Sequence, residues 1–212
     1  MQPLRAEKAN QEGLSMRSYF ALSTVAAIAA FSVAACNKPA AEAPAVEPVN
    51  AAQDAVGAAV GQTSAATLGA NDTDAFVSNA SQSDMYEVEA GKVAQSRSKN
   101  DAVKSFAAMM VSDHTAMMNE MKPLVAAAQK TPAAALDERR QGFIDNLKAA
   151  TAADFDRTYI AQQAAAHEEA LTLMRGYADN GGDAGLKAGA AKAVPKIQAH
   201  LDQAKSLQRS AK

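Results

Sequence analysis

The sequence of 212 residues contains no tryptophan, and aromatic residues make up only 5% of it. Aromatic and β-branched residues are the ones that favour strands, whereas alanine, which is abundant throughout this chain, is the strongest helix former. The scarcity of aromatic side chains therefore argues against a β-sheet protein. We predict an all-α fold.

The sequence also has only one cysteine and no excess of positive charge. The single cysteine, Cys36, excludes an intrachain disulfide and any metal site built from several thiolates. The 21 Lys and Arg residues are balanced by 23 Asp and Glu residues, which gives a formal net charge of −2. Because nucleic-acid-binding domains carry a basic patch, we expect no nucleic-acid partner.

The common catalytic motifs are missing as well. The sequence has no glycine-rich phosphate loop, no Gly-x-Ser-x-Gly nucleophile elbow and no His-Glu-x-x-His zinc motif. We therefore predict no catalytic residues, and the expectation for enzymatic activity leans towards none. The residues that could take part in a functional site are a small number of histidines.

The first 35 residues have the pattern of an export signal. Arg17 supplies a positive charge, and a mostly apolar run follows over 19–33, which is short for a membrane-spanning helix. The run ends in Val33-Ala34-Ala35-Cys36, which resembles the bacterial lipobox. We predict a signal peptide over residues 1–35 and lipidation of Cys36. An ordinary secretory signal, with Cys36 uninvolved, is the alternative.

Two details refine this prediction. Residues 1–15 are polar and precede the basic residue, so Met16 is the better start and the first 15 residues suggest a misassigned start codon. Asn37 follows the cysteine where lipoproteins kept in the inner membrane tend to carry Asp. We therefore expect a lipid anchor as the membrane contact, on the periplasmic side of the cell envelope and in the outer membrane. No protein partner is indicated.

Residues 36–70 are rich in alanine, proline and small polar residues. Pro39, Pro44 and Pro48 interrupt any helix early in this stretch. The composition predicts a flexible tether in which residues 51–60 form at most a transient helix. The folded domain is then expected over residues 71–212.

Apolar residues recur in that domain at steps of three and four, the spacing of one face of a helix. Capping residues and glycine or proline breaks divide it into four long helices and a short connecting one. Gly181-Gly182 is expected to end the third long helix in the left-handed conformation. Short turns after the first and third helices imply antiparallel neighbours and a four-helix bundle. The predicted ranges are 73–98, 101–131, 136–149 (the connecting helix), 154–180 and 184–212.

The chain has only three histidines, and each lies on the apolar seam of a different predicted helix: His114, His167 and His200. The remaining long helix has Glu87 on its seam. At about 1.5 Å of rise per residue, the four positions lie within about one helical turn of one another in height. Three imidazoles and a carboxylate form a suitable ligand set for zinc or iron.

A metal-free interpretation stays open beside this one. Buried histidines also occur in bundles with one nitrogen bonded to a backbone carbonyl or a hydroxyl, and Glu87 can pair with Lys92 or Arg157. The acidic neighbours of the histidines, Asp113, Glu168 and Glu169, are expected to point elsewhere, because adjacent helical residues diverge by about 100°.

Two other metals are less well supported. Methionines flank His114, and thioethers with an imidazole suit copper, yet methionine at helical spacing is more often a core filler. A di-iron centre needs Glu-x-x-His pairs, but Ala164 and Ile197 stand three residues before His167 and His200. The methionines that flank His114 are Met109, Met110, Met117, Met118 and Met121.

Several stretches together resemble a bacterial family known as domain of unknown function 4142. The resemblance covers about residues 74–207 and implies a ferritin-like four-helix fold in an exported, envelope-attached protein of no established activity. The family's Glu, Asp-His and two later His positions match Glu87, Asp113-His114, His167 and His200. The matching stretches are Glu87-Val88-Glu89-Ala90-Gly91-Lys92-Val93-Ala94, Val103 to His114, Phe155-Asp156-Arg157-Thr158-Tyr159-Ile160, and Pro195 with His200-Leu201.

The sequence thus supports three hypotheses. The first is an envelope lipoprotein whose bundle binds a divalent transition metal through Glu87, His114, His167 and His200. The second is a metal-free structural or interaction module of the cell envelope. The third, with less support, is a metal-dependent redox enzyme.

Overall fold

The computed structural model describes residues 47–210, so the predicted signal peptide and Cys36 lie outside the described residues. Within 47–210 the secondary structure is helical, without a strand, which confirms the all-α prediction. The helices are α1 (Glu47–Ala66), α2 (Leu68–Asn71), α3 (Thr73–Arg97), α4 (Asp101–Ala127), α5 (Glu138–Ala149), α6 (Phe155–Asn180) and α7 (Ala184–Ser210).

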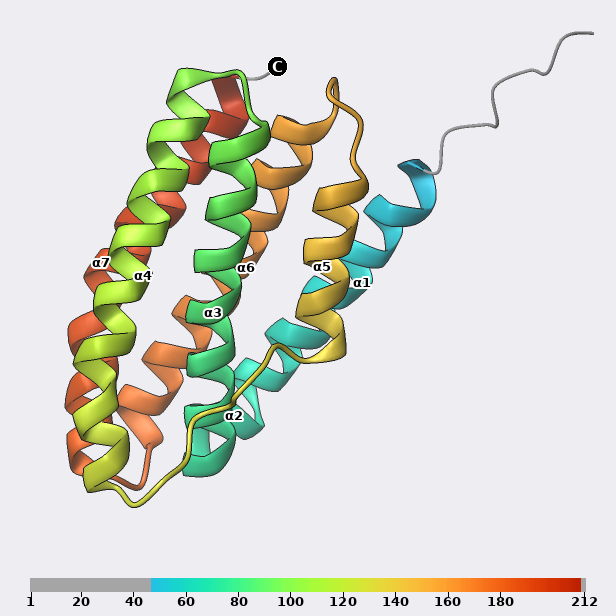
Figure 1. Cartoon of the computed structure of the whole chain (residues 1–212). Helices are drawn as coiled ribbons and strands as arrows, with labels where there is room; N and C mark the ends of the chain where they lie inside the picture. Colours follow the sequence, from blue (N-terminus) through green and yellow to red (C-terminus); the bar gives the residue numbers. More distant parts are fainter. Residues whose placement is uncertain (1–46, 211–212) are drawn as a thin grey trace, which may run out of the picture. The chain divides into compact units, whose positions relative to one another are not determined.

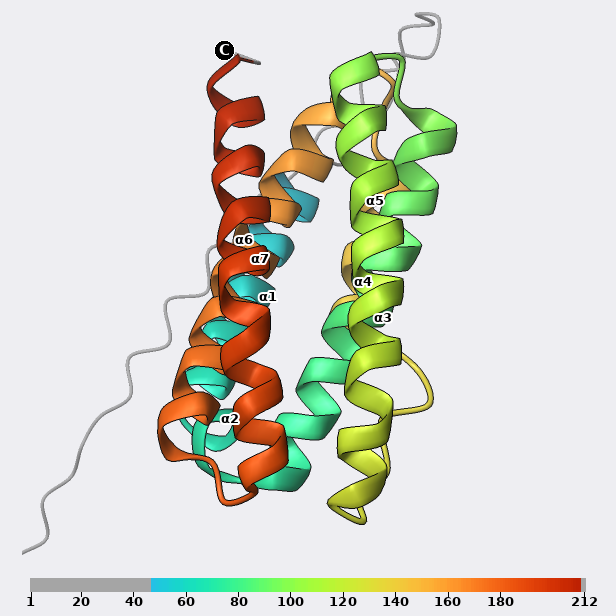
Figure 2. The same ribbon diagram turned by 90° about the vertical axis from the view of Figure 1, so that its left-hand side faces the viewer.

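Four long helices form the predicted antiparallel bundle. Helices α3 and α4 make one hairpin and α6 and α7 make another, and the hairpins pack together through α4 against α7 and α3 against α6 (Figures 1 and 2). The connection from α4 through α5 returns the chain to the end of the bundle where α4 began, so α6 runs antiparallel to α3 (Figure 1). Each of the four helices therefore presents one side to a common core.

Side-chain caps fix where these helices begin. The Asp72 carboxylate accepts a hydrogen bond from the backbone N–H of Ala75 at 2.8 Å. Asn100 caps α4 in the same way, and Asp183 accepts from the backbone N–H of Leu186 at 2.8 Å at the start of α7. Such caps satisfy amides that have no partner within the helix. A short polar side chain thus marks the first turn of α3, α4 and α7.

Two predicted helix ends are different in the structure. Neither Gly181 nor Gly182 is left-handed, since Gly181 caps α6 in an extended conformation with φ −61°. The left-handed residue is instead Gln129, with φ 57°. Helix α4 therefore ends at Ala127 rather than near residue 131, because the N–H of Lys130 bonds back to the carbonyl of Val125 at 3.0 Å.

The prediction of a flexible tether over residues 36–70 was wrong from residue 47 onwards. Helices α1 and α2 occupy this region and pack along α6, with α1 also against α5 (Figure 1). Asp54 of α1 accepts hydrogen bonds from Asn146 at 2.8 Å and Gln162 at 2.7 Å. The folded domain therefore begins well before residue 71.

The core of the bundle combines aromatic and aliphatic side chains from all four long helices. Near the α6–α7 turn the rings of Phe76 and Tyr177 stack with their centroids 3.8 Å apart. Phe106 and Tyr159 pack edge to face at the other end of the bundle. Among the described residues, none of the helices combines the length and the apolar character that crossing a membrane requires.

Candidate metal centre

The four predicted ligand residues come together in the middle of the bundle, one from each long helix. Glu87 of α3, His114 of α4, His167 of α6 and His200 of α7 are each at most 2% exposed. The three imidazole rings form a nearly equilateral triangle, with centroids 5.4, 5.4 and 5.5 Å apart. The seam positions and heights inferred from the sequence agree with this clustering.

Each histidine offers one ring nitrogen to a common space. The three offered nitrogens lie within 4.8 Å of one another. One nitrogen of each ring is buried without a hydrogen-bond partner among the described residues: Nε2 of His114, Nε2 of His167 and Nδ1 of His200. Tetrahedral zinc at about 2.0–2.1 Å from each nitrogen would hold them about 3.4 Å apart. A modest contraction of the triangle is enough for coordination.

The other nitrogen of each ring is held by a neighbour. Nδ1–H of His114 donates to Asp84 Oδ1 at 2.8 Å, and Nε2–H of His200 donates to Asp113 Oδ2 at 2.9 Å. In His167, Nδ1–H donates to the backbone carbonyl of Gln163 at 2.8 Å. A carboxylate or carbonyl behind a histidine fixes its tautomer and orients its free lone pair. In its neutral form each ring is therefore set with an acceptor nitrogen facing the core.

Glu87 supplies the negative charge at the centre. Its Oε1 lies 3.7 Å from Nδ1 of His167, and its Oε2 is buried without a hydrogen-bond partner among the described residues. Burial raises the pKa of Glu87 to about 7, against the opposing influence of His114. A carboxylate in this position is favourable only beside a positive charge. Glu87 thus lies beside the histidine group, against the nitrogen of His167 that the Gln163 carbonyl holds, and the group of mutually close ligand atoms is formed by the three histidines.

The histidines differ in their affinity for protons. Burial holds the pKa of His167 well below its ordinary value and lowers that of His200. Burial also acts to lower the pKa of His114, but the hydrogen bond to Asp84 and the charge of Glu87 outweigh it and raise the pKa. Two of the three rings are thus neutral at pH 7, the form in which imidazole binds a metal.

Sequence reasoning missed the two carboxylates behind the histidines. Asp113 was expected to point elsewhere, yet it reaches across to His200 of a neighbouring helix, and Lys196 pairs with its other oxygen at 3.2 Å. Asp84 holds His114 in the corresponding way. The available signal was its spacing, because Asp84 stands three residues before Glu87 and therefore lies on the same face of α3.

The remaining acidic and basic residues near the site are engaged elsewhere. Glu168 pairs with Lys205 at 2.7 Å, and Glu169 is bound by Arg139 and Arg140, each at 2.8 Å. Arg157, which was an expected partner of Glu87, pairs with Asp154 instead. The prediction that Glu168 and Glu169 point away from the centre therefore agrees with the structure.

The methionines of α4 occupy positions in and around the hydrophobic core. Met110 is fully buried, and Met117 and Met121 pack against the core. These positions agree with the interpretation of methionine as a filler of irregular space. The group whose donor atoms converge on one another is the histidine triangle.

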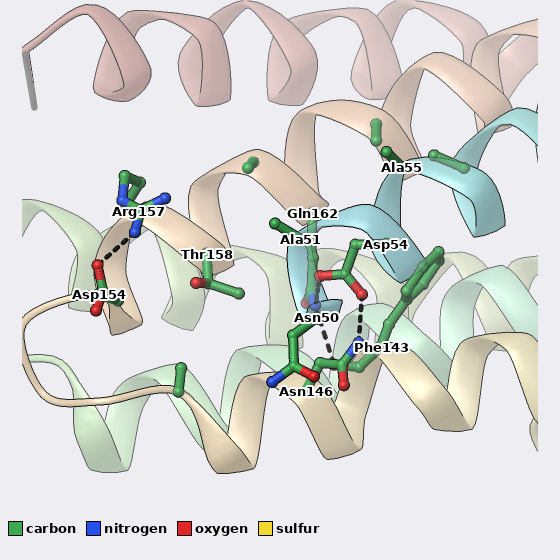
Figure 3. Close-up of a pocket in the computed structure, with 14 residues that line it drawn as sticks. Asn50, Ala51, Asp54, Ala55, Phe143, Asn146, Asp154, Arg157, Thr158 and Gln162 are labelled. Atoms are coloured by element: carbon green, nitrogen blue, oxygen red, sulfur yellow. Dashed lines mark hydrogen bonds and ion pairs between the residues drawn. The ribbon is translucent and has the colours of Figure 1, made fainter. Parts of the chain in front are cut away.

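A cavity of about 230 Å³ between α1, α5 and α6 is a second candidate site (Figure 3). Asp54, Asn146 and Gln162 lie together in its wall, where Asn146 and Gln162 both donate to the Asp54 carboxylate, while Arg157 pairs with Asp154 at its other end (Figure 3). The remaining lining is largely alanine. These polar groups satisfy one another, so they fasten α1 to the bundle.

Fold and site together define a class, a helical-bundle protein with a buried three-histidine cluster able to hold a metal ion. The family described as Domain of unknown function (DUF4142) matches residues 58–207, and the chain belongs to this family. The match begins inside α1, which agrees with the inclusion of that helix in the folded domain. Comparisons with curated proteins and with solved structures gave no match.

Proposed function

We propose that this protein binds one divalent transition metal ion, zinc or iron, in the core of its bundle. His114, His167 and His200 are the proposed ligands, with Glu87 as the fourth. The observation that carries the proposal is the set of three buried ring nitrogens without partners, each on a ring whose other nitrogen is already held.

A metal-free polar core is less well supported by these contacts. Buried polar atoms without a partner cost about 1–3 kcal/mol each, and native cores contain few of them. The centre would concentrate three such nitrogens within 4.8 Å of one another, with the Glu87 carboxylate beside them. A cation accepts electron pairs from all four groups at once and balances the Glu87 charge, so it removes this cost.

The donor set supports metal holding rather than turnover. Four protein ligands complete a tetrahedral shell, whereas catalytic zinc sites keep one position for water or substrate. All four residues are at most 2% exposed, which also excludes bulk water from the centre. When bound, the ion would supply a fixed positive charge and a cross-link between four helices.

The proposed location is the periplasmic side of the cell envelope, through a lipid on Cys36 and in the outer membrane. The apolar run over 19–33, followed by two small residues and the lone cysteine, supports this part of the proposal. A mass spectrum of the protein from bacterial membranes should give a mature N-terminus at Cys36 carrying a diacyl modification. A mature N-terminus elsewhere, without lipid, would contradict it.

The metal proposal is tested by elemental analysis of the purified protein. We expect about one equivalent of zinc or iron in the wild type and none in a variant with all three histidines changed to alanine. Tyr159→Phe is a matched control, because it removes a buried hydroxyl without a partner from the same core and leaves every ligand in place. Substoichiometric metal in the wild type, unchanged in the triple variant, would disprove the proposal.

The same samples distinguish metal holding from redox catalysis. The loaded protein should not consume peroxide or oxygen faster than the triple histidine variant does. Metal-dependent turnover that the triple variant lacks would favour the redox-enzyme hypothesis.

A further inference from the structure

The buried centre needs a path by which a metal ion enters and leaves. The three histidines are at most 2% exposed, so the ion cannot reach them directly from solvent. The structure contains a cavity of about 430 Å³ between α3, α4 and the loop after α4. This cavity is separate from the one between α1, α5 and α6, and none of the proposed ligands lines it.

One residue joins the cavity to the centre. Asp84 lines the cavity, and the same carboxylate accepts the hydrogen bond from His114 Nδ1 at 2.8 Å. The Asp84–His114 pair is therefore the boundary between the cavity and the three converging nitrogens. An ion in the cavity would meet a carboxylate first and an imidazole immediately behind it.

The remaining cavity wall offers neutral donors to a borderline cation such as zinc. Met85, Met118 and Met121 bring thioether groups to the wall, and Asn119 adds a polar side chain. Lys122 and Lys130 also line the cavity, and the Lys130 ammonium is paired with Asp74 at 2.8 Å. A neutral thioether attracts such an ion less strongly than the anionic carboxylate of Asp84 does. The donors thus strengthen from the wall of the cavity towards Asp84.

We propose that the cavity between α3 and α4 is the access route of the metal centre, with Asp84 as its inner ligand in transit. The inference depends on the proposed function, since a route matters only where an ion is bound. It adds a role for Asp84 beyond the orientation of His114, and a role for the methionines of α4 that core packing does not include.

Narrowing the cavity tests the route without touching the ligands. Ala126 and Ala127 are neighbouring exposed residues of α4, and only Ala126 lines the cavity. In Ala126→Phe the ring can occupy the cavity, whereas in Ala127→Phe it points to a different side of the helix. An obstruction that raises the barrier by about 1.4 kcal/mol slows metal release about tenfold.

The measurement is the rate at which the loaded protein gives up zinc to an excess of a chromophoric chelator. We expect release about tenfold slower in Ala126→Phe than in Ala127→Phe and in the wild type. Met118→Ala, which widens the cavity, should make release faster. Equal rates in all four proteins, with one zinc bound to each, would overturn the route while leaving the metal site intact.

The same assay distinguishes the cavity between α3 and α4 from an alternative exit path past Asp113. Asp113 is 25% exposed at its side chain and contacts His200 and Lys196 on the side of α4 that faces α7. If Lys196→Ala accelerates release while the cavity variants match the wild type, the ion leaves past Asp113 and the proposal is wrong. An absence of zinc from the wild type would instead refute the metal site itself.

Discussion

At the scale of single residues, the centre depends on the groups behind its ligands. Asp113 accepts from His200, and burial, which raises its pKa, is outweighed by the hydrogen bonds from His200 and Lys196, so its pKa lies below the ordinary value. The carboxylate is thus ionised at neutral pH. A charged acceptor makes the imidazole a better electron donor and fixes its ring orientation.

Asp113→Ala should therefore weaken metal binding about 10–100-fold, the range found for residues that support a metal ligand. Competition with a chromophoric chelator measures this affinity. Lys196→Ala is the matched control, because it breaks the ion pair on Asp113 and leaves the bond to His200 intact. Equal losses in the two variants would show that surface charge, rather than support of His200, sets the affinity.

The histidine cluster was predictable from the sequence, and the carboxylates behind it were not. With only three histidines, each on an apolar seam at a similar height, helical periodicity was enough to predict the cluster. Asp84 and Asp113 act across helix interfaces instead, on His114 of α4 and His200 of α7. Such contacts depend on helix rotation and crossing, which residue spacing along one helix does not determine.

At the scale of elements, the buried face of α1 consists of small residues, and hydrophobic periodicity does not identify such a face. Gly57, Gly61 and Ala65, each four residues apart, form its buried side. Its large apolar residues Val56 and Val60 are 65% and 57% exposed, so hydrophobicity suggests the wrong face. The glycines let the backbone of α1 come close to its neighbours, since a Cβ on Gly57 would lie 2.8 Å from the ring of Phe143.

Gly61→Ala should loosen this contact. The new methyl group would overlap the Glu169 carboxylate and lie 2.5 Å from Nη1 of Arg139, so the ion pair between them must shift. We expect the free energy of unfolding to fall by about 1–3 kcal/mol, as for other overpacked sites. Urea denaturation measures this change.

Gly142→Ala provides the opposite case. Gly142 lies inside α5, and a Cβ there would have no atom within 4 Å. Alanine should therefore stabilise the protein by about 0.5–1 kcal/mol through its helix preference alone. If both glycine variants gained stability, α1 would not be docked through Gly61.

At the scale of the whole molecule, the proposed metal links helices that are far apart in the sequence. Binding to the folded state alone stabilises it by about 2.7 kcal/mol at a free metal concentration 100 times the Kd. For a domain of this size each kcal/mol raises Tm by about 2–4 °C. We therefore expect zinc to raise Tm by about 5–11 °C and a chelator to reverse the rise.

Thermal unfolding followed by circular dichroism measures this shift. The variant with all three histidines changed to alanine should show no difference with and without zinc. A zinc effect of the same size in that variant would place the stabilising ion elsewhere on the protein.

The arrangement of α3, α4, α6 and α7 was predictable because their seams contain large apolar residues and their ends contain capping residues. The connection from α4 to α6 was harder to predict from the sequence. Gln129, rather than a glycine, adopts the left-handed conformation that ends α4. Glutamine adopts the left-handed conformation only when tertiary contacts require it, so its presence in the sequence does not indicate a helix end.

The last ligand, His200, belongs to α7, the final helix of the bundle. During synthesis a ribosome releases Glu87, His114 and His167 before α7 exists, and a nascent chain at that stage has two histidines and no triangle. The centre closes only when α7 docks. Retention of a metal ion by all three histidines would then require that α7 had docked, and chains that ended before His200 would lack one of the three imidazoles.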